Sequence, residues 1–266
     1  MRGPPRAAFI PDVPRHPLCI PGPPLVIGHR GAAAVRPENT LPSFAHALAV
    51  GVDAIEFDVR LTRDGTAVVH HDADTARTCG ERRVVATSTL AALRRLDASA
   101  TFDGDVVRPA RIPTLDEALE LTRGLPVIIE CKTVDVAPVV VATLRRHGDT
   151  GRALVGSFLH EAMTAVRAAG LASCASRRDM IALSMRAWLG LAPERLPMAA
   201  MAIPERYGAI TLPLPTIAAM AARLGVPVHV WTVNDPADAT RLWRAGVTGI
   251  LSDDPATIIA ARARPA

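Results

Sequence analysis

The chain has 266 residues and a formal net charge of +4, and 49% of its residues are hydrophobic. This length and composition predict one large domain with a sizeable core. They argue against a transmembrane helix, because no apolar run approaches the ~18 residues needed to cross a bilayer, and the scattered arginines argue against nucleic-acid binding.

The first 24 residues contain eight prolines. No apolar segment of the kind found in secretory signals follows the basic start of the chain. We therefore expect residues 1–24 to form an extended, proline-rich tail. Residues 25–266 are expected to form a single barrel domain.

Short apolar strands alternate with amphipathic helices from residue 25 onward, and glycine follows many of the helices. Strands are expected near residues 25–28, 54–55, 67–69, 127–131, 153–157, 171–175, 228–233 and 249–252. Helices are expected near residues 41–50, 115–123, 134–147, 160–169, 216–224, 236–245 and from 255 onward. Repeated strand–helix units over ~240 residues favour an α/β fold of the (β/α)8 TIM-barrel type.

Two regions interrupt this alternation. Residues 73–113 are polar and contain one helical pattern, at 90–96, so we expect a small inserted cap over the mouth of the barrel. Residues 177–208 contain a possible helix at 180–191, which is either an extra helix or the sixth helix of the barrel.

The strand expected at 67–69 poses a topological problem. The link over residues 60–66 is too short for the crossover that parallel strands require. The segment either pairs as a hairpin that turns at Asp64-Gly65, or returns outside the barrel without a helix. Including a weak candidate at 209–211, nine strand candidates compete for the eight strand positions of such a barrel.

Glu56 and Asp58 lie two residues apart on an expected strand, so their side chains point to the same side, while Phe57 points toward the helices. Two carboxylates on one apolar face repel each other unless a cation lies between them. Oxygen ligands suit Mg²⁺ or Ca²⁺, with Mn²⁺ also possible, better than zinc. The alternative is a structural pair that meets arginine partners.

Glu130 and Lys132 repeat this geometry at the end of another expected strand. Glu130 could complete the metal-ligand set, and Lys132 could contact a phosphoryl oxygen. Lys132 is the single lysine among 30 basic residues, which suggests that its chemistry is specifically needed. The alternative is a simple ion pair at the end of a strand.

His29 and His71 each follow an apolar strand and can serve as a general acid and a general base. Taken singly, each is better explained as a structural histidine, but because both follow strands with matching polar ends they are better explained as a catalytic pair. His70 alternates away from the expected site. Arg30 offers a planar fork for a phosphate. Trp231 could line a substrate pocket or belong to the barrel core. A small-molecule phosphodiester fits this inventory of cations, carboxylates and histidines.

Many separated motifs, in order from about residue 25 to the end, resemble those of the glycerophosphodiester phosphodiesterases. The motifs are His29-Arg30-Gly31, Pro37-Glu38-Asn39-Thr40, Glu56-Phe57-Asp58-Val59, Asp64-Gly65, His71-Asp72, residues 112–119, Glu130-Cys131-Lys132, Ser157-Phe158 and Trp231-Thr232-Val233-Asn234. The resemblance implies a TIM-type barrel with a small insertion after the His-Asp motif. It also implies hydrolysis of compounds such as glycerophosphocholine to sn-glycerol 3-phosphate and an alcohol.

The matching motifs imply that His29 and His71 are the acid–base pair and that Arg30 and Lys132 lie near the phosphate. They further imply Glu56, Asp58 and Glu130 as the metal ligands, and attack on phosphorus by the 2-hydroxyl of the substrate. Cys131, and Ser252 in the motif Ser252-Asp253-Asp254-Pro255, depart mildly from the family pattern, and neither departure is expected to touch the chemistry. Rival interpretations are lysophospholipase D activity on long-chain substrates, a non-catalytic binding barrel, and an unrelated metal-dependent lyase or isomerase.

The cysteines Cys19, Cys79, Cys131 and Cys174 are far apart and form no CxxC pair. This spacing argues against a zinc site or a disulfide framework. Isolated cysteines behave as small hydrophobic groups and suit a reducing compartment, so we expect a cytoplasmic protein. The sequence does not indicate an oligomeric state.

Overall fold

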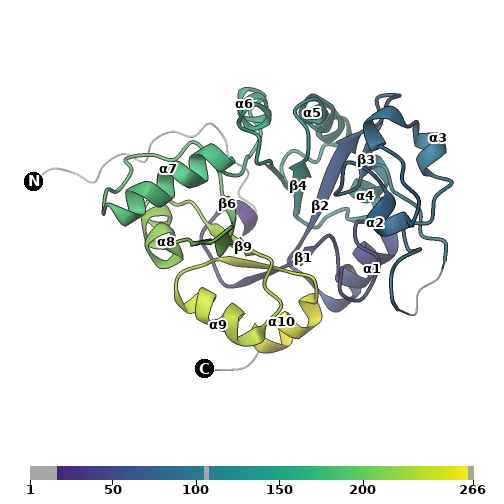
Figure 1. Cartoon of the computed structure of the whole chain (residues 1–266). Helices are drawn as coiled ribbons and strands as arrows, with labels where there is room; N and C mark the ends of the chain where they lie inside the picture. Colours follow the sequence, from purple (N-terminus) through teal and green to yellow (C-terminus); the bar gives the residue numbers. More distant parts are fainter. Residues whose placement is uncertain (1–16, 105–107, 263–266) are drawn as a thin grey trace, which may run out of the picture.

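Parallel strands form a barrel in the computed structural model, which describes residues 17–104 and 108–262 (Figure 1). Seven strands pair in the order β5-β4-β2-β1-β10-β9-β6. They are β1 (Leu25–His29), β2 (Ala54–Leu61), β4 (Val127–Cys131), β5 (Ala153–Gly156), β6 (Met201–Pro204), β9 (Val228–Trp231) and β10 (Gly249–Ser252). Two isolated parallel bridges, Val155 with Ser173 and Cys174 with Ala200, connect β5 to β6 and close the ring. The predicted TIM-type barrel is therefore confirmed.

Helices cover the outside of the barrel and follow its strand positions in turn (Figure 1). They are α1 (Leu41–Val50), α4 (Leu115–Leu121), α5 (Val136–His147), α6 (His160–Ala168), α7 (Arg177–Trp188), α8 (Leu214–Ala222), α9 (Pro236–Arg244) and α10 (Pro255–Arg262). Local sequence starts several of them. Thr40 caps α1, Thr114 and Glu117 form a capping box on α4, and Asp235 caps α9. Each side chain satisfies backbone N–H groups that a helix start leaves without partners.

The region 177–208 contains a barrel helix, α7, but it is the fifth helix of the ring and not the sixth. The expected strand at 171–175 shrinks to the two bridging residues, Ser173 and Cys174, and β6 occupies an unexpected place at 201–204. The weak strand candidate at 209–211 lies outside the barrel, where β8 (Ile210–Thr211) pairs with β7 (Arg206–Tyr207).

The segment at 67–69 pairs as a hairpin, which decides between the two topologies. β3 (Ala67–Val69) runs antiparallel to β2, with Val69 opposite Val59. The Thr62 backbone N–H donates to the Thr66 carbonyl at 3.0 Å, and Gly65 takes a positive φ of 76° that glycine adopts without strain. Because the chain doubles back, the N–H of His70 reaches the carbonyl of Asp58 at 3.0 Å. The hairpin thus returns His71 to the end of β2.

Three short helical segments, α2 (Ala76–Cys79), η2 (Val85–Thr87) and α3 (Leu90–Leu93), lie between β3 and α4. They bury a small apolar cluster of their own against Val68 of β3. Its buried members are Val68, Cys79, Val85, Leu93, Leu96, Ala98 and Ile112. The insertion therefore packs on the hairpin rather than on the helices of the ring.

The barrel interior and the helix layer form separate apolar layers. Phe57 points outward and packs on Phe44 of α1 with ring centroids 5.3 Å apart, as its place between Glu56 and Asp58 predicts. All four cysteines lie within the described residues, where they are buried and form no disulfide. No helix in the described ranges has the length and apolar character needed to span a bilayer.

Residues 1–16 of the expected tail lie outside the described residues, but residues 17–24 are ordered against the barrel. The short helix η1 (Pro17–Cys19) buries Leu18 and Cys19 in the interior cluster with Leu25 and Ile27 of β1. The carbonyl of Leu18 accepts a hydrogen bond from Nε2 of His229 on β9 at 3.0 Å. This segment therefore closes one end of the barrel interior.

We expect Leu18→Ala to lower the free energy of unfolding by about 2–5 kcal/mol, because it removes a fully buried side chain and leaves a cavity. Urea unfolding followed by circular dichroism measures this loss. Ile20→Ala, two residues along the same segment and 44% exposed, is the matched control and should change stability little. Equal losses in both variants would show that Leu18 does not seal the barrel.

Candidate active site

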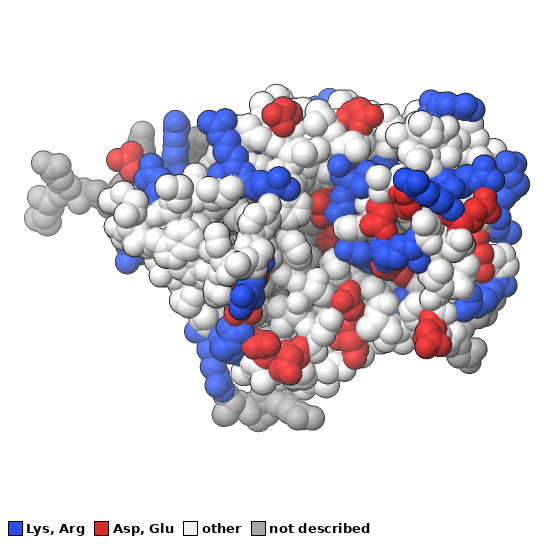
Figure 2. Space-filling view, in the orientation of Figure 1, with Lys and Arg blue, Asp and Glu red and all other residues white. Residues whose placement is uncertain are grey.

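A pocket opens among the carboxyl ends of the barrel strands. The lining combines charged groups with apolar ones: His29, Arg30, Glu56, His71, Ile128, Glu130, Lys132, Gly156, Ser157, Phe158, Cys174, Ala175, Ala202, Trp231 and Leu251. Figure 2 shows acidic and basic side chains meeting around a central hollow, mainly over the half of the molecule that contains β2 and the insertion. Ligands commonly bind at this end of such barrels.

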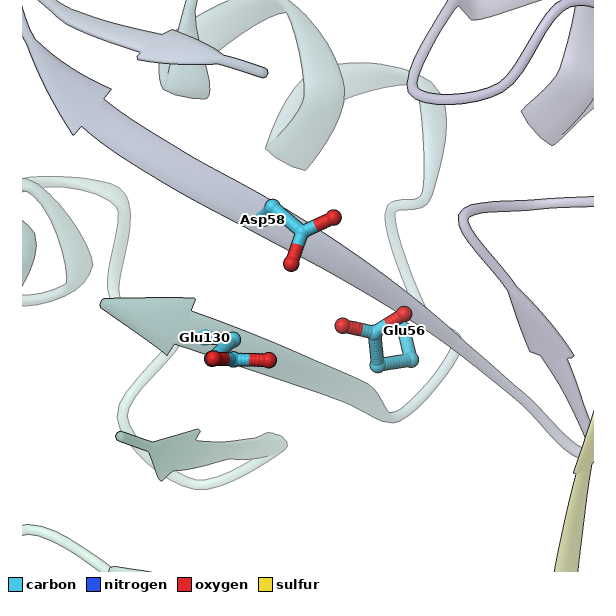
Figure 3. A group of neighbouring side chains, drawn as sticks. All are labelled: Glu56, Asp58 and Glu130. Atoms are coloured by element: carbon cyan, nitrogen blue, oxygen red, sulfur yellow. The ribbon is translucent and has the colours of Figure 1, made fainter. Parts of the chain in front are cut away.

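Three carboxylates meet at the pocket, two of which, Glu56 and Glu130, belong to its lining (Figure 3). Glu56 and Asp58 extend from β2, and Glu130 extends from β4, where it is in register with Asp58. One oxygen from each lies within 4.8 Å of the others. Burial and the charge of Asp58 raise the pKa of Glu56 to about 7. This crowding of buried oxygen ligands is the donor chemistry that a hard divalent cation requires, so the residues present fit such an ion.

Two basic side chains lie among these carboxylates. The Lys132 ammonium is 2.8 Å from Asp58 Oδ1 and 2.9 Å from Glu130 Oε1. Arg30 Nε is 3.4 Å from Asp58 Oδ2, and the Arg30 backbone N–H donates to Glu56 at 3.1 Å. Burial alone would raise the pKa of Asp58, but the charges of these two cations lower it by more than burial raises it. The pKa of this carboxyl is therefore held well below its usual value. Lys132 and Arg30 thus keep Asp58 ionised.

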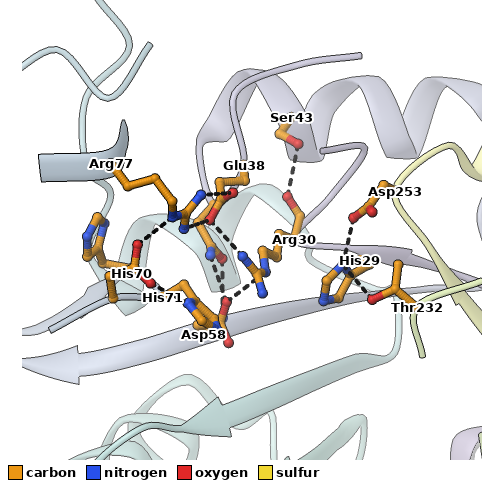
Figure 4. Close-up of polar contacts among 12 residues, drawn as sticks. His29, Arg30, Glu38, Ser43, Asp58, His70, His71, Arg77, Thr232 and Asp253 are labelled. Atoms are coloured by element: carbon orange, nitrogen blue, oxygen red, sulfur yellow. Dashed lines mark hydrogen bonds and ion pairs between the residues drawn. The ribbon is translucent and has the colours of Figure 1, made fainter. Parts of the chain in front are cut away.

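His29 is held by a carboxylate from the far end of the chain (Figure 4). Its Nδ1 lies 2.7 Å from Asp253 Oδ1, and its Nε2 lies 3.9 Å from Glu56 Oε2. Burial lowers the pKa of His29, but the Asp253 hydrogen bond and the Glu56 charge outweigh burial, so the net shift is upward. The contact at Nδ1 fixes the ring orientation and leaves Nε2 as the nitrogen available to a ligand.

Ser252, which differs from the usual family residue, belongs to a hydrogen-bond chain that ends at this histidine. The Ser252 hydroxyl donates to Asn234 Oδ1 at 2.9 Å, and Asn234 Nδ2 donates to Asp253 at 3.0 Å. The variant position is therefore connected to His29 through Asn234 and Asp253. A serine hydroxyl can make the same hydrogen bond as a threonine hydroxyl, so the chain to His29 is complete.

His71 is held in the same way from the other side of the pocket. Its Nδ1 lies 2.7 Å from Asp72 Oδ1. Burial lowers the pKa of His71, and the charges of Lys132 and Arg30 act in the same direction, although Asp58 opposes them. His70 points elsewhere, with Nε2 bonded to the Asp74 carbonyl at 3.0 Å, so it is structural as predicted.

Arg77 connects both sides of the site, and the sequence analysis did not single it out (Figure 4). Its Nε donates to Asp72 at 2.6 Å, and its two terminal nitrogens donate to both oxygens of Glu38 at 2.7 Å. Glu38 in turn accepts from Arg30 at 2.9 Å. One side chain from α2 therefore orders the carboxylate that holds His71 and the carboxylate that holds Arg30.

Asn39 is a further residue whose place the motif alone did not explain. Its side-chain amide donates to Asp58 Oδ2 at 2.8 Å and accepts from the Asp58 backbone N–H at 3.2 Å. The two asparagines of the chain, Asn39 and Asn234, thus both hold carboxylates of the site. Their rarity in this arginine-rich composition itself indicates that their chemistry is specifically needed.

The opposite wall of the pocket is apolar. Trp231 meets Phe158 edge to face, with ring centroids 5.8 Å apart and an interplanar angle of 86°. Trp231 lines this pocket and also packs against the interior cluster. The pocket can therefore contact a charged group on one side and an apolar group on the other.

Comparison with known proteins identifies the family. The model of the glycerophosphoryl diester phosphodiesterase family matches residues 29–257. A glycerophosphodiester phosphodiesterase of Caldanaerobacter subterraneus subsp. tengcongensis is 32% identical over 245 residues, which cover 88% of this chain and 96% of the relative. One of Bacillus subtilis is 28% identical over 249 residues, covering 87% of this chain and 84% of the relative.

Solved structures agree in fold. A phosphodiesterase of Oleispira antarctica, in complex with the product sn-glycerol-3-phosphate, superposes with a TM-score of 0.73 at 26% identity, covering 90% of this chain and 96% of the other. A glycerophosphodiester phosphodiesterase of Agrobacterium tumefaciens gives 0.72 at 27% identity, covering 89% and 99%. The barrel, its pocket and the match over most of the chain together place this protein in the glycerophosphoryl diester phosphodiesterase family.

Proposed function

We propose that the protein hydrolyses glycerophosphodiesters, such as glycerophosphocholine, to sn-glycerol 3-phosphate and an alcohol. The observation that carries this proposal is a pair of histidines, His29 and His71, each held at Nδ1 by a carboxylate and both lining one pocket. The same pocket contains the carboxylate cluster and two cations that suit an anionic phosphodiester. The relative in complex with sn-glycerol-3-phosphate supports the nature of the product.

The two histidines would move the protons of the reaction. One accepts the proton of the substrate's 2-hydroxyl, whose oxygen then attacks phosphorus, and the other protonates the departing alkoxide. In the second step the roles reverse, and water opens the cyclic phosphate to give the phosphomonoester. Asp253 and Asp72 hold the rings so that each Nε2 stays directed to the pocket.

Glu56, Asp58 and Glu130 would hold one divalent cation, Mg²⁺, Ca²⁺ or Mn²⁺. When bound, the cation supplies positive charge that stabilises the charge developing on the phosphoryl oxygens. Arg30 and Lys132 line the same pocket and would bind the remaining phosphoryl oxygens. Trp231 and Phe158 would contact the alcohol portion of the substrate.

The apolar wall also favours a second candidate, lysophospholipase D activity on long-chain lysophospholipids. Phe158 and Trp231, with Ala175 and Ala202, could contact the start of an acyl chain. We further propose that residues 25–266 act as one catalytic domain in which residues 73–113 cap the pocket. Arg77 supports this role for the insertion because it reaches both Asp72 and Glu38.

A coupled assay that detects glycerol 3-phosphate tests the proposed function. The substrates are glycerophosphocholine, glycerophosphoethanolamine and a lysophosphatidylcholine, each with added Mg²⁺, Ca²⁺ or Mn²⁺. Release of glycerol 3-phosphate from the first two supports the proposal, and release of choline from the lysolipid alone favours the second candidate. The assignment fails if none of the three substrates is cleaved with any of the ions.

We expect Arg77→Ala to lower kcat/KM by about 10–100-fold, because Asp72 and Glu38 lose the partner that orders them. Arg82→Ala is the matched control: Arg82 lies in the same insertion and pairs with Asp74 at 2.8 Å, away from the pocket lining. Steady-state kinetics on both variants measures the difference. Arg77→Lys, which keeps the charge but not the fork, should restore only part of the activity. Similar kinetics in the two alanine variants would show that Arg77 does not support activity by ordering Asp72 and Glu38.

A further inference from the structure

An apolar stripe lies on the outer face of α7, the helix that follows the seam between β5 and β6. Six of the ten large hydrophobic side chains exposed in the described ranges fall between residues 181 and 210. Four of them form what is here called the outer stripe: Ile181, Met185, Trp188 and Leu189, which are 46%, 55%, 53% and 68% exposed. Figure 2 shows basic side chains over the part of the molecule that contains α7, beside uncharged surface.

The stripe is separate from the face with which α7 packs on the barrel. At about 100° of rotation per residue, the four side chains lie within an arc of roughly 100°. The buried face consists of Met180, Leu183, Ser184 and Ala187, which lie outside this arc. Helix α7 thus has two apolar faces, and only the buried face packs against the barrel. Core packing therefore does not account for the outer stripe.

Exposed positive charge surrounds the outer stripe. Between residues 177 and 211 the exposed charged side chains are five arginines and one glutamate: Arg177, Arg178, Arg186, Arg195, Arg206 and Glu194. The other two acidic residues of this stretch are already paired, Asp179 with Arg167 at 2.7 Å and Glu205 with Arg241 at 2.9 Å. The surface that would meet a partner is therefore apolar with a basic rim.

Helix α7 is also anchored beside the pocket. The guanidinium of Arg177, its first residue, lies 5.5 Å from the ring centroid of Phe158 and 5.9 Å from that of Tyr207. Phe158 belongs to the apolar wall of the pocket, and Ala175, two residues before α7, belongs to the same lining. The outer stripe thus lies further along a helix whose first residue contacts that wall.

We propose that the outer stripe of α7 seats the protein on an anionic lipid surface. A membrane interface matches both properties of the patch, because Trp, Leu, Ile and Met insert at the boundary of the acyl chains while surrounding arginines meet acidic headgroups. Tryptophan in particular favours this boundary, since its ring is apolar and its N–H is polar. The single exposed glutamate near the stripe opposes the charge attraction only weakly. This surface role goes beyond the proposed hydrolysis and does not depend on it.

Vesicle sedimentation of the full chain tests the proposal. The probes are vesicles of pure phosphatidylcholine and vesicles that contain phosphatidylglycerol in addition, each at low and high salt. We expect partition into the anionic vesicles that falls with salt. Trp188→Ser combined with Leu189→Ser should weaken this binding at least about tenfold. Val134→Ser combined with Leu121→Ser alters two exposed hydrophobic residues elsewhere and should leave it unchanged.

Charge is tested with a second pair of variants. Arg178→Gln combined with Arg186→Gln should weaken binding roughly twentyfold, whereas Arg63→Gln combined with Arg123→Gln, which removes the same charge far from α7, should not. Failure of the wild-type chain to bind anionic vesicles at low salt would overturn the proposal. So would a wild-type dimer in light scattering that Leu189→Glu converts to a monomer, because the stripe would then bind a second copy. Unchanged cleavage of a glycerophosphodiester in solution by all variants separates this result from a failure of the proposed function.

Discussion

Replacement of His29 or His71 by alanine is expected to lower kcat by about 10²–10⁴-fold, the range that a positioned general acid or base contributes. Neither ring is needed for the core, since both histidines line the pocket. Circular dichroism and thermal unfolding should therefore match the wild-type chain. His46→Ala, a histidine on α1 that is absent from the pocket lining, is the control.

The same variants can separate the acid from the base. A glycerophosphodiester of p-nitrophenol needs no protonation of its leaving group, because p-nitrophenolate is already a stable anion. The variant that lacks the general acid should therefore recover on this substrate, and the variant that lacks the general base should not. Near-wild-type turnover of glycerophosphocholine by either alanine variant would remove that histidine from the mechanism.

Removal of divalent cations is expected to lower activity at least about 100-fold, and addition of one suitable ion should restore it. The physical reason is the crowding of Glu56, Asp58 and Glu130, whose mutual repulsion a cation would relieve. The ion should also raise the melting temperature of the wild-type chain, because a ligand that binds only the folded state stabilises that state. Differential scanning fluorimetry measures this effect without substrate.

Glu56→Gln and Glu130→Gln should each abolish the thermal shift and most of the activity. Glu161→Gln, on the exposed surface of α6, is the matched control and should leave both intact. An enzyme that stays fully active after exhaustive chelation would rule out a catalytic cation. A thermal shift that persists in the Glu56 and Glu130 variants would place the ion elsewhere.

Local patterns predicted most of the barrel because each strand–helix unit has its own signals. The capping residues Thr40, Thr114 and Asp235 begin helices where the pattern predicts. Strand β6 was missed because its segment, Met201–Pro204, is short, ends in proline and follows an irregular loop. Its place depends on pairing with β9, which is a non-local contact.

The predicted chemical groups of the site do meet, but their supporting partners could not be read from local sequence. Asp253 lies 224 residues from His29 and reaches it only because β1 pairs with β10 when the barrel closes. Arg77 belongs to an insertion without regular periodicity, so no sequence pattern indicates that its side chain points toward the site. The ends of the predicted strands indicate which side chains enter the pocket. The residues that hydrogen-bond to those side chains are brought close only when the barrel closes.

The seam between β5 and β6 has fewer paired backbone positions than the pairing of β2 with β4. β2 and β4 pair over five register positions and hold the carboxylates between them. At the seam, by contrast, Ser173 and Cys174 each form one isolated bridge, beside the apolar wall that contains Phe158 and Ala175. Local opening costs least where few backbone hydrogen bonds must break. We therefore expect local opening near the seam, where the alcohol of the substrate would lie, and not at the paired strands that hold the carboxylates. Backbone amides near the seam should exchange with solvent first.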